Sequence, residues 1–209
     1  LRSMWERGWS FIKKAGTIIL LSTIFVWFTS RFGWLDGQFG MLEEDQISAS
    51  ILAKIGNAIC WIFAPLGWGN WQATVASITG LVAKENIVGT LGVLYSGGAG
   101  TVYDAIAAAF TGITGYSFLV FNLLCAPCFA AIGAIKREMN SPKWTWFAIG
   151  YQCGFAYAVA LMINQFGGLF TGNANIIGVI AAVIVLAAII YMLVRPYKEA
   201  TKLTTKVEM

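Results

Sequence analysis

The fold is decided by one uncharged stretch near the carboxyl end, WTWFAIGYQCGFAYAVALMINQFGGLFTGNANIIGVIAAVIVLAAIIYMLV, residues 144–194. These 51 positions between Lys143 and Arg195 contain no Lys, Arg, Asp or Glu. A helix needs about 20 apolar residues to cross the hydrocarbon core of a bilayer, so this stretch is long enough for two crossings. A β-barrel is disfavoured because the stretch is continuously apolar rather than alternating.

The composition extends this conclusion to the whole chain. Of the 209 residues, 58% are hydrophobic and 11% are charged, whereas a soluble domain carries about 25% charged residues. This excludes a soluble globular domain, a nucleic-acid binder and a disordered tail. The chain has no histidine, which excludes a Ser-His-Asp triad and a His-ligated zinc site. It also lacks a P-loop motif, and we expect no enzymatic activity in this chain.

The apolar runs and their interruptions predict an all-α polytopic membrane protein with about six segments, some of them broken or re-entrant. The second segment is short and carries Lys54. If it is re-entrant, the third must be re-entrant too, which leaves a four-span alternative open. The predicted spans are 16–30, 51–66, 71–95, 116–135, 144–166 and 176–194, with a short additional helix at 104–110.

The positions of Lys and Arg predict the orientation in the membrane. Basic residues lie before the first span, between the fourth and fifth spans, and after the sixth, whereas loops 36–45 and 165–175 have none. Since basic loops stay in the cytoplasm, both ends are expected to be cytoplasmic. The predicted divisions are a cytosolic amphipathic lead helix at 1–15, membrane segments at 16–95 and 96–194, and a basic cytosolic tail at 195–209.

The triplet Lys84-Glu85-Asn86 interrupts the third apolar run between Gly80 and Gly89. A charge at the bilayer centre costs about 2.5–3.5 kcal/mol on insertion scales, so such residues persist where they pair or face a cavity. Flanking glycines permit a helix break that frees backbone carbonyls for a cation, as in transporters. We therefore expect the triplet to line a transport pathway. The structural alternative is that Lys84 bonds a neighbouring helix and Glu85 bonds a backbone group.

A second motif is the C-x-x-C sequence formed by Cys125 and Cys128. In a helix this spacing places both sulfurs on one face, one turn apart, and Pro127 would loosen the preceding turn. Thiolates are soft ligands that suit transition metals, while buried cysteines are also common packing residues. The pattern leaves a metal site, packing and a redox pair open.

Polar side chains in the fifth run are further pathway candidates. Gln152 and Asn164 lie within an otherwise apolar segment. Side-chain amides in membrane helices usually form interhelical hydrogen bonds, and contact with a transported solute is the functional alternative.

Four stretches of the sequence occur together in a fixed order: WERGWSFIKKAGTIIL (5–20), ITGLVAKENIVGTLGVLY (78–95), PCFAAIGAIKRE (127–138) and KWTWFAIGYQ (143–152). In this order they resemble the membrane part of ferrous iron transport protein B (FeoB). The resemblance covers roughly residues 2–165 and implies the carboxy-terminal part of a bacterial inner-membrane Fe²⁺ importer, with 16–95 as its second gate segment. Fe²⁺ would then be the transported substrate and not a permanently bound cofactor.

The resemblance also implies site residues and partners. It places a functional cysteine at Cys128 and makes Glu85 a pathway acid, whereas many relatives have an apolar residue at the position of Cys125. The partners implied are an upstream GTPase and first gate half, membrane lipid, small cytosolic accessory proteins and further copies of the chain. Because the sequence starts at Leu1, we expect the polypeptide to begin upstream.

The leading hypothesis is therefore a permeation domain for ferrous iron, with Cys128, Glu85 and Cys125 as metal ligands. One alternative is a transporter of nucleosides or other small polar solutes, bound by Asn86, Gln152 and Asn164. A second is a membrane thiol-redox protein that uses Cys125 and Cys128, and a third is an assembly subunit that transports nothing itself.

Overall fold

The computed structural model describes residues 2–35, 38–81, 84, 86–95, 101–172 and 175–195, and most of them are helical. This confirms the all-α class. The helices are α1 (Arg2–Arg31), α2 (Ile51–Ile59), α3 (Trp71–Gly80), α4 (Asn86–Leu94), α5 (Val102–Ala109), α6 (Gly112–Leu124), α7 (Phe129–Met139), α8 (Pro142–Thr171) and α9 (Ile176–Val194); two 3-10 helices, η1 (Glu44–Ala49) and η2 (Cys60–Leu66), and two strands, β1 (Phe32–Leu35) and β2 (Gln38–Met41), complete the described elements.

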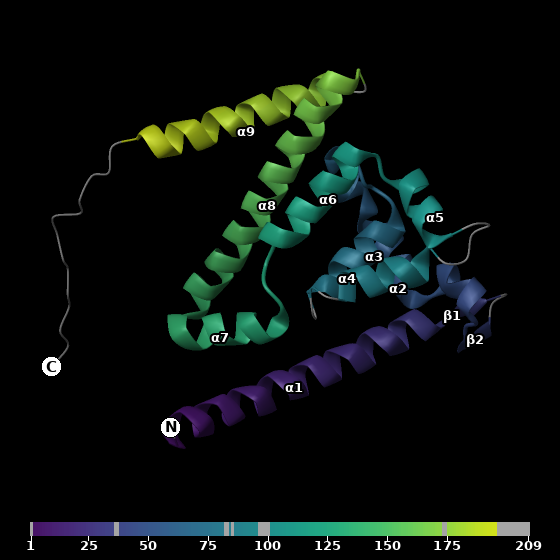
Figure 1. The fold of residues 1–209 in the computed structure, drawn as a ribbon, viewed down its shortest axis with the longest axis vertical. Helices are drawn as coiled ribbons and strands as arrows, with labels where there is room; N and C mark the ends of the chain where they lie inside the picture. The colour runs from purple at the N-terminus through teal and green to yellow at the C-terminus, as the bar shows by residue number, and fades with distance from the viewer. Residues whose placement is uncertain are drawn as a thin grey trace, which may run out of the picture.

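The helices form a central group flanked by three long helices. α6 packs along α8, α2 packs on α3, and α3 packs on α4. Figure 1 shows α1 running along one edge of the molecule, where it contacts α2 and α7, while α9 leaves the far end of α8. The short helices α2 to α6 therefore lie between α1 and the α8–α9 pair.

The core is built around an aromatic cluster at the end of η2. The ring of Trp68 is 1% exposed and stacks on Phe63 at a centroid distance of 4.5 Å. Two rings of α6 complete the cluster, with Phe118 at 5.1 Å and Phe121 at 5.3 Å from Trp68. Ala156 and Ala160 of α8 close the far side. Small residues on α8 let the aromatic rings approach the backbone of that helix closely.

Side-chain caps fix where the short central helices begin. Ser50 Oγ accepts a hydrogen bond from Ala53 N at 3.0 Å at the start of α2, and Asn70 Oδ1 accepts one from Ala73 N at 2.7 Å at the start of α3. These bonds satisfy backbone donors that have no partner inside the helix. Between the two helices, Gly67 ends η2 at φ 91°, a conformation that favours glycine.

The predicted break in the third run is confirmed, and the fourth predicted span, 116–135, is also broken. The range 71–95 divides into α3 and α4. Residues 116–135 were expected to form one span, but α6 ends at Leu124 and α7 begins at Phe129. The physical reason is Pro127, which disfavours helical geometry at the preceding residue and cannot donate a backbone hydrogen bond.

A short hairpin that sequence analysis missed, β1 with β2, overlaps the loop expected at 36–45. β1 and β2 pair antiparallel, with Phe32 opposite Met41 and Trp34 opposite Phe39. Gly33 lies directly against the backbone of η1, because a Cβ at this position would overlap the carbonyl oxygen of Ala49. The hairpin and η1 together lie at the carboxyl end of α1.

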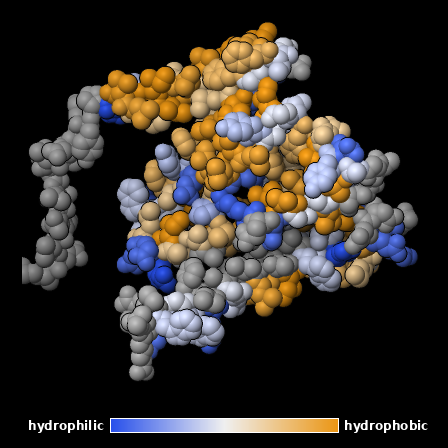
Figure 2. All heavy atoms as spheres, viewed as in Figure 1, coloured by the Kyte–Doolittle hydropathy of each residue, from blue (hydrophilic) through white to orange (hydrophobic). Residues whose placement is uncertain are grey.

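Long apolar helices confirm the membrane class. In the described part of the chain, α8 and α9 are long and apolar enough to cross a membrane. Two bent pairs pass the same test together: residues 51–66 with α3, at 96°, and α5 with α6, at 94°. The described helices thus provide two crossings, or up to four, and the expected count of six stays a prediction. Figure 2 shows hydrophobic side chains covering α9, as expected of a lipid-facing helix.

Two glycines with positive φ allow backbone strain to be separated from packing. We expect Gly172→Ala to lower the free energy of unfolding by about 1 kcal/mol, because φ is 75° and the space around it is open. Gly67→Ala should cost about 3 kcal/mol or more, since its Cβ would also overlap Asn164 and Thr114. Unfolding of both variants in detergent measures the difference, and equal losses would show that the packing around Gly67 contributes nothing.

Candidate functional site

Two helix interruptions, one between α3 and α4 and one between α6 and α7, lie side by side in the structure. The backbone N–H of Phe129 donates to the carbonyl oxygen of Leu81 at 2.9 Å. In return, the Lys84 ammonium donates to the carbonyl oxygen of Leu123 at 2.9 Å. Each interruption therefore supplies hydrogen-bond partners to the other. The acid of the triplet, Glu85, lies outside the described residues, between Lys84 and Asn86 in sequence.

The two cysteines of the C-x-x-C motif do not share a helix face, so that prediction is wrong. Cys125 ends α6 with ψ 167°, and Cys128 precedes α7 with ψ 160°; both values are extended. Pro127 causes the difference because it opens the chain between the two sulfurs. The Sγ atom of Cys125 instead lies 4.0 Å from the Sγ atom of Cys153 on α8.

The expected metal ligands are only partly described. Among the described residues, no three His, Cys, Asp or Glu side chains lie close enough to hold a metal together. Glu85 is not among them, so the ligand set of Cys128, Glu85 and Cys125 stays a prediction. Cys125 and Cys128 are both partly buried.

The predicted polar pathway residues are not brought together. Asn86 lines a cavity of about 370 Å³, whereas Asn164 lines a separate cavity of about 1160 Å³. Gln152 lines neither cavity, and its Oε1 atom is buried without a hydrogen-bond partner in the described part of the chain. Neither of these two cavities is lined by more than one of the three amides.

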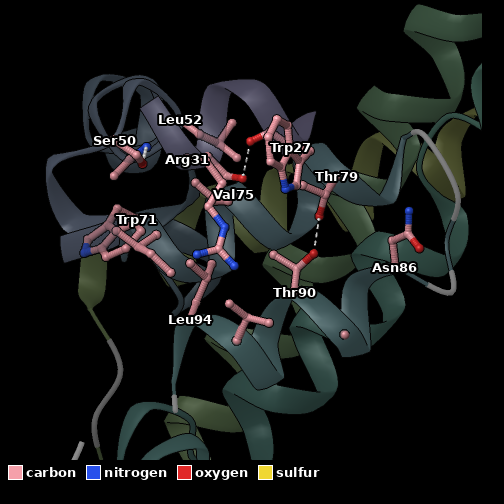
Figure 3. Close-up of a pocket in the computed structure, with 15 residues that line it drawn as sticks. Trp27, Arg31, Ser50, Leu52, Trp71, Val75, Thr79, Asn86, Thr90 and Leu94 are labelled. Carbon is pink, nitrogen blue, oxygen red and sulfur yellow. Dashed lines mark hydrogen bonds between the residues drawn. The ribbon is translucent and has the colours of Figure 1, made fainter. Parts of the chain in front are cut away.

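The smaller cavity lies between α1, α2, α3 and α4, and Figure 3 shows its lining. The guanidinium of Arg31 points into it between Val75 and Leu94. Thr79 and Thr90 join α3 to α4 across it through a hydrogen bond of 3.0 Å. Nothing in the local sequence pattern indicates that Arg31, which directly follows the predicted span 16–30, lines a cavity.

Polar side chains of α6 and α8 satisfy the carbonyl groups at the end of η2. The amides of Asn164 and Gln165 both donate to Pro65 O, at 3.0 and 2.7 Å. The hydroxyl of Tyr157 donates to Ile62 O at 2.8 Å, and Ser117 Oγ lies 3.0 Å from Leu66 O. The usual structural role of Asn164, an interhelical hydrogen bond, is thus observed. Sequence analysis missed Ser117 and Tyr157, because their partners are 51 and 95 positions away in sequence.

The bond from Lys84 to Leu123 can be tested through the reactivity of the neighbouring thiol. Lys84→Met removes the donor, so we expect the 125–128 segment to open more often and Cys125 to react faster with a maleimide. Lys54→Met is the matched control, because the Lys54 ammonium lies over Trp34, 4.7 Å from the ring centroid, in another part of the fold. Equal labelling rates in the two variants would show that the bond does not hold the interruptions together.

The sequence of the chain is similar to one protein family and to several known proteins. The Gate family model, described as nucleoside recognition, matches residues 12–142. The Fe(2+) transporter FeoB of Methanocaldococcus jannaschii is 40% identical over 172 residues, which is 81% of this chain and 25% of that protein. The Fe(2+) transporter FeoB of Staphylococcus aureus is 35% identical over 169 residues, 81% of this chain and 24% of that protein.

A third relative is the Fe(2+) transport protein A/Fe(2+) transporter FeoB fusion protein of Porphyromonas gingivalis, 29% identical over 210 residues, 80% of this chain and 25% of that protein. The chain thus spans about a quarter of the length of the curated relatives that it matches. No solved structure shows significant similarity to it. The chain belongs to the Gate family, and its similarity to these relatives confirms the expected resemblance to the membrane part of FeoB.

Proposed function

We propose that this chain is the membrane permeation part of a GTPase-coupled ferrous iron importer. The relatives that it matches are named as Fe(2+) transporters. Fe²⁺ is then cargo, and the chain itself performs no catalysis. The nucleotide-driven steps belong to an upstream GTPase and first gate half, and the fusion relative supports a small accessory protein as a further partner.

The observation that carries the proposal is the meeting of the two helix interruptions. The hydrogen bond from Phe129 N to Leu81 O brings the Pro-Cys sequence beside the segment that contains Lys84 and Asn86. A broken helix presents backbone carbonyls at membrane depth, which is where transporters bind their ions. The thiol of Cys128 would join such carbonyls as a ligand, and the proposed carboxylate ligand, Glu85, is the neighbour of Lys84 in sequence.

This combination of groups fits partly dehydrated Fe²⁺. Carbonyl and carboxylate oxygens replace some of the lost water, and a thiolate favours a transition metal over Mg²⁺ or Ca²⁺. The acidic residues Asp36 and Glu43–Asp45 in and beside the hairpin would raise the local cation concentration at the entrance. The ion would then pass the junction of the two interruptions and leave on the opposite side.

The arrangement of the helix ends supports cytoplasmic termini. In Figure 1 the start of α1, helix α7 and the end of α9 lie toward one side of the molecule, and β1 and β2 lie toward the other. The first group carries the basic sequence segments, including Lys136 and Arg137 in the last turn of α7. By the positive-inside rule this side faces the cytoplasm, which puts the hairpin outside the cell or in the periplasm.

The competing functions receive less support. Asn86 and Asn164 line different cavities, which argues against one nucleoside or polar-solute site built from both. A Cys125–Cys128 redox pair is disfavoured because the closest thiol partner of Cys125 is Cys153. Competition between unlabelled nucleosides and iron during uptake discriminates between the two cargoes.

Iron uptake by cells that depend on this protein tests the proposal. We expect Cys128→Ser and Glu85→Gln each to reduce the uptake of radioactive Fe²⁺ by about tenfold or more, since each variant removes one ligand. Cys60→Ser is the matched control. Cys60 is a free thiol that hydrogen-bonds Asn57 O at 3.3 Å in another helix, and its variant should transport normally.

The protein level in the membrane must be equal in all strains for this comparison. Wild-type uptake rates in both Cys128→Ser and Glu85→Gln would contradict the site assignment. Uptake that is lost in Cys60→Ser as well would show that the thiol effect is general and not specific to the junction.

A further inference from the structure

One pair of thiols connects two helices at a position that no sequence motif indicates. Cys125 ends α6 and Cys153 lies within α8, 28 positions apart in sequence, with their sulfur atoms 4.0 Å apart. Both side chains are partly buried and neither is in a disulfide. The resemblance to FeoB implies a role for Cys128 but none for Cys153.

The distance between the two sulfurs matches one edge of a tetrahedral metal site. With metal–sulfur bonds of about 2.3 Å, two thiolates on a tetrahedral ion lie about 3.8 Å apart. The observed distance between the two sulfur atoms, 4.0 Å, is slightly longer than this edge. Small rotations of the two side chains can remove the difference. Binding would therefore need no movement of the helices.

The backbone around the pair is held in place. Cys125 N donates to Phe121 O at 2.8 Å, and the Cys125 side chain packs against the aromatic core cluster. α6 lies along α8, and Ser117 Oγ of α6 is 3.0 Å from Ala160 O of α8. These contacts hold both sulfurs at a fixed separation before any ion arrives.

We propose that Cys125 and Cys153 form a two-thiolate site for a thiophilic divalent cation beside the junction of the helix interruptions. Binding replaces the two S–H protons, so two protons are released for each ion bound, and water or backbone carbonyls complete the coordination. Its place on the iron pathway rests on the proposed function, whereas the binding itself does not. Such a pair would bind Fe²⁺, Zn²⁺ and other thiophilic divalent cations, whereas Mg²⁺ and Ca²⁺ would not bind to it.

Cadmium is the probe, because its thiolate complexes absorb in the ultraviolet. The full-length protein is purified in detergent with its thiols reduced and is titrated with Cd²⁺. We expect the charge-transfer absorption to fall, and the affinity to weaken about tenfold or more, in Cys125→Ser and in Cys153→Ser. Cys60→Ser should retain the wild-type absorption, because this thiol lies in another part of the fold. An unchanged titration in Cys125→Ser or in Cys153→Ser, or an equal loss in Cys60→Ser, would overturn the proposal.

A second measurement uses the wild-type protein and so does not depend on the folding of variants. Maleimide labelling with and without Cd²⁺, followed by peptide mass spectrometry, should show protection of Cys125 and Cys153 together and no protection of Cys60. Protection of neither residue, or of only one, overturns the pair. Normal iron uptake by Cys128→Ser would instead contradict the proposed function and leave the cadmium result unaffected, so the two failures are distinguishable.

Discussion

The structure depends on the need to satisfy every backbone polar group where water is scarce. An uninterrupted helix meets this need by itself, but an interrupted helix leaves N–H and C=O groups without partners. Here two interruptions satisfy one another, through the bond from Phe129 N to Leu81 O and the bond from Lys84 to Leu123 O. The contact fixes the relative positions of the two segments.

The end of η2 meets the same need in a different way. Its carbonyl groups accept hydrogen bonds from side chains of other helices, among them Tyr157 and Gln165. Those side chains are occupied in holding the fold and are poor candidates for cargo ligands. Near the junction, the contact that the described part of the chain shows between a thiol and another helix is the one between Cys125 and Cys153. In this way the fold separates the polar groups that stabilise it from those that are free to bind an ion.

Sequence patterns predicted the features that depend on neighbouring residues. The lack of charge over 144–194 predicted two long apolar helices, and α8 and α9 confirm them. The charged triplet between two glycines predicted the break between α3 and α4. The Asp-Gly pair at positions 36–37 is a known hairpin signal, and it was overlooked beside the acidic residues. Pro127 signalled a break in the fourth run, but the C-x-x-C spacing was interpreted as helical. No local pattern could connect Cys125 with Cys153, because that contact depends on how α6 packs on α8.

The central claim is that iron meets sulfur where the two helix interruptions join. X-ray absorption at the iron edge, measured on the full-length protein loaded with Fe²⁺ under anaerobic reducing conditions, tests this claim directly. The account predicts at least one sulfur neighbour of the iron together with oxygen neighbours. A spectrum that is fitted by oxygen and nitrogen neighbours alone would contradict it.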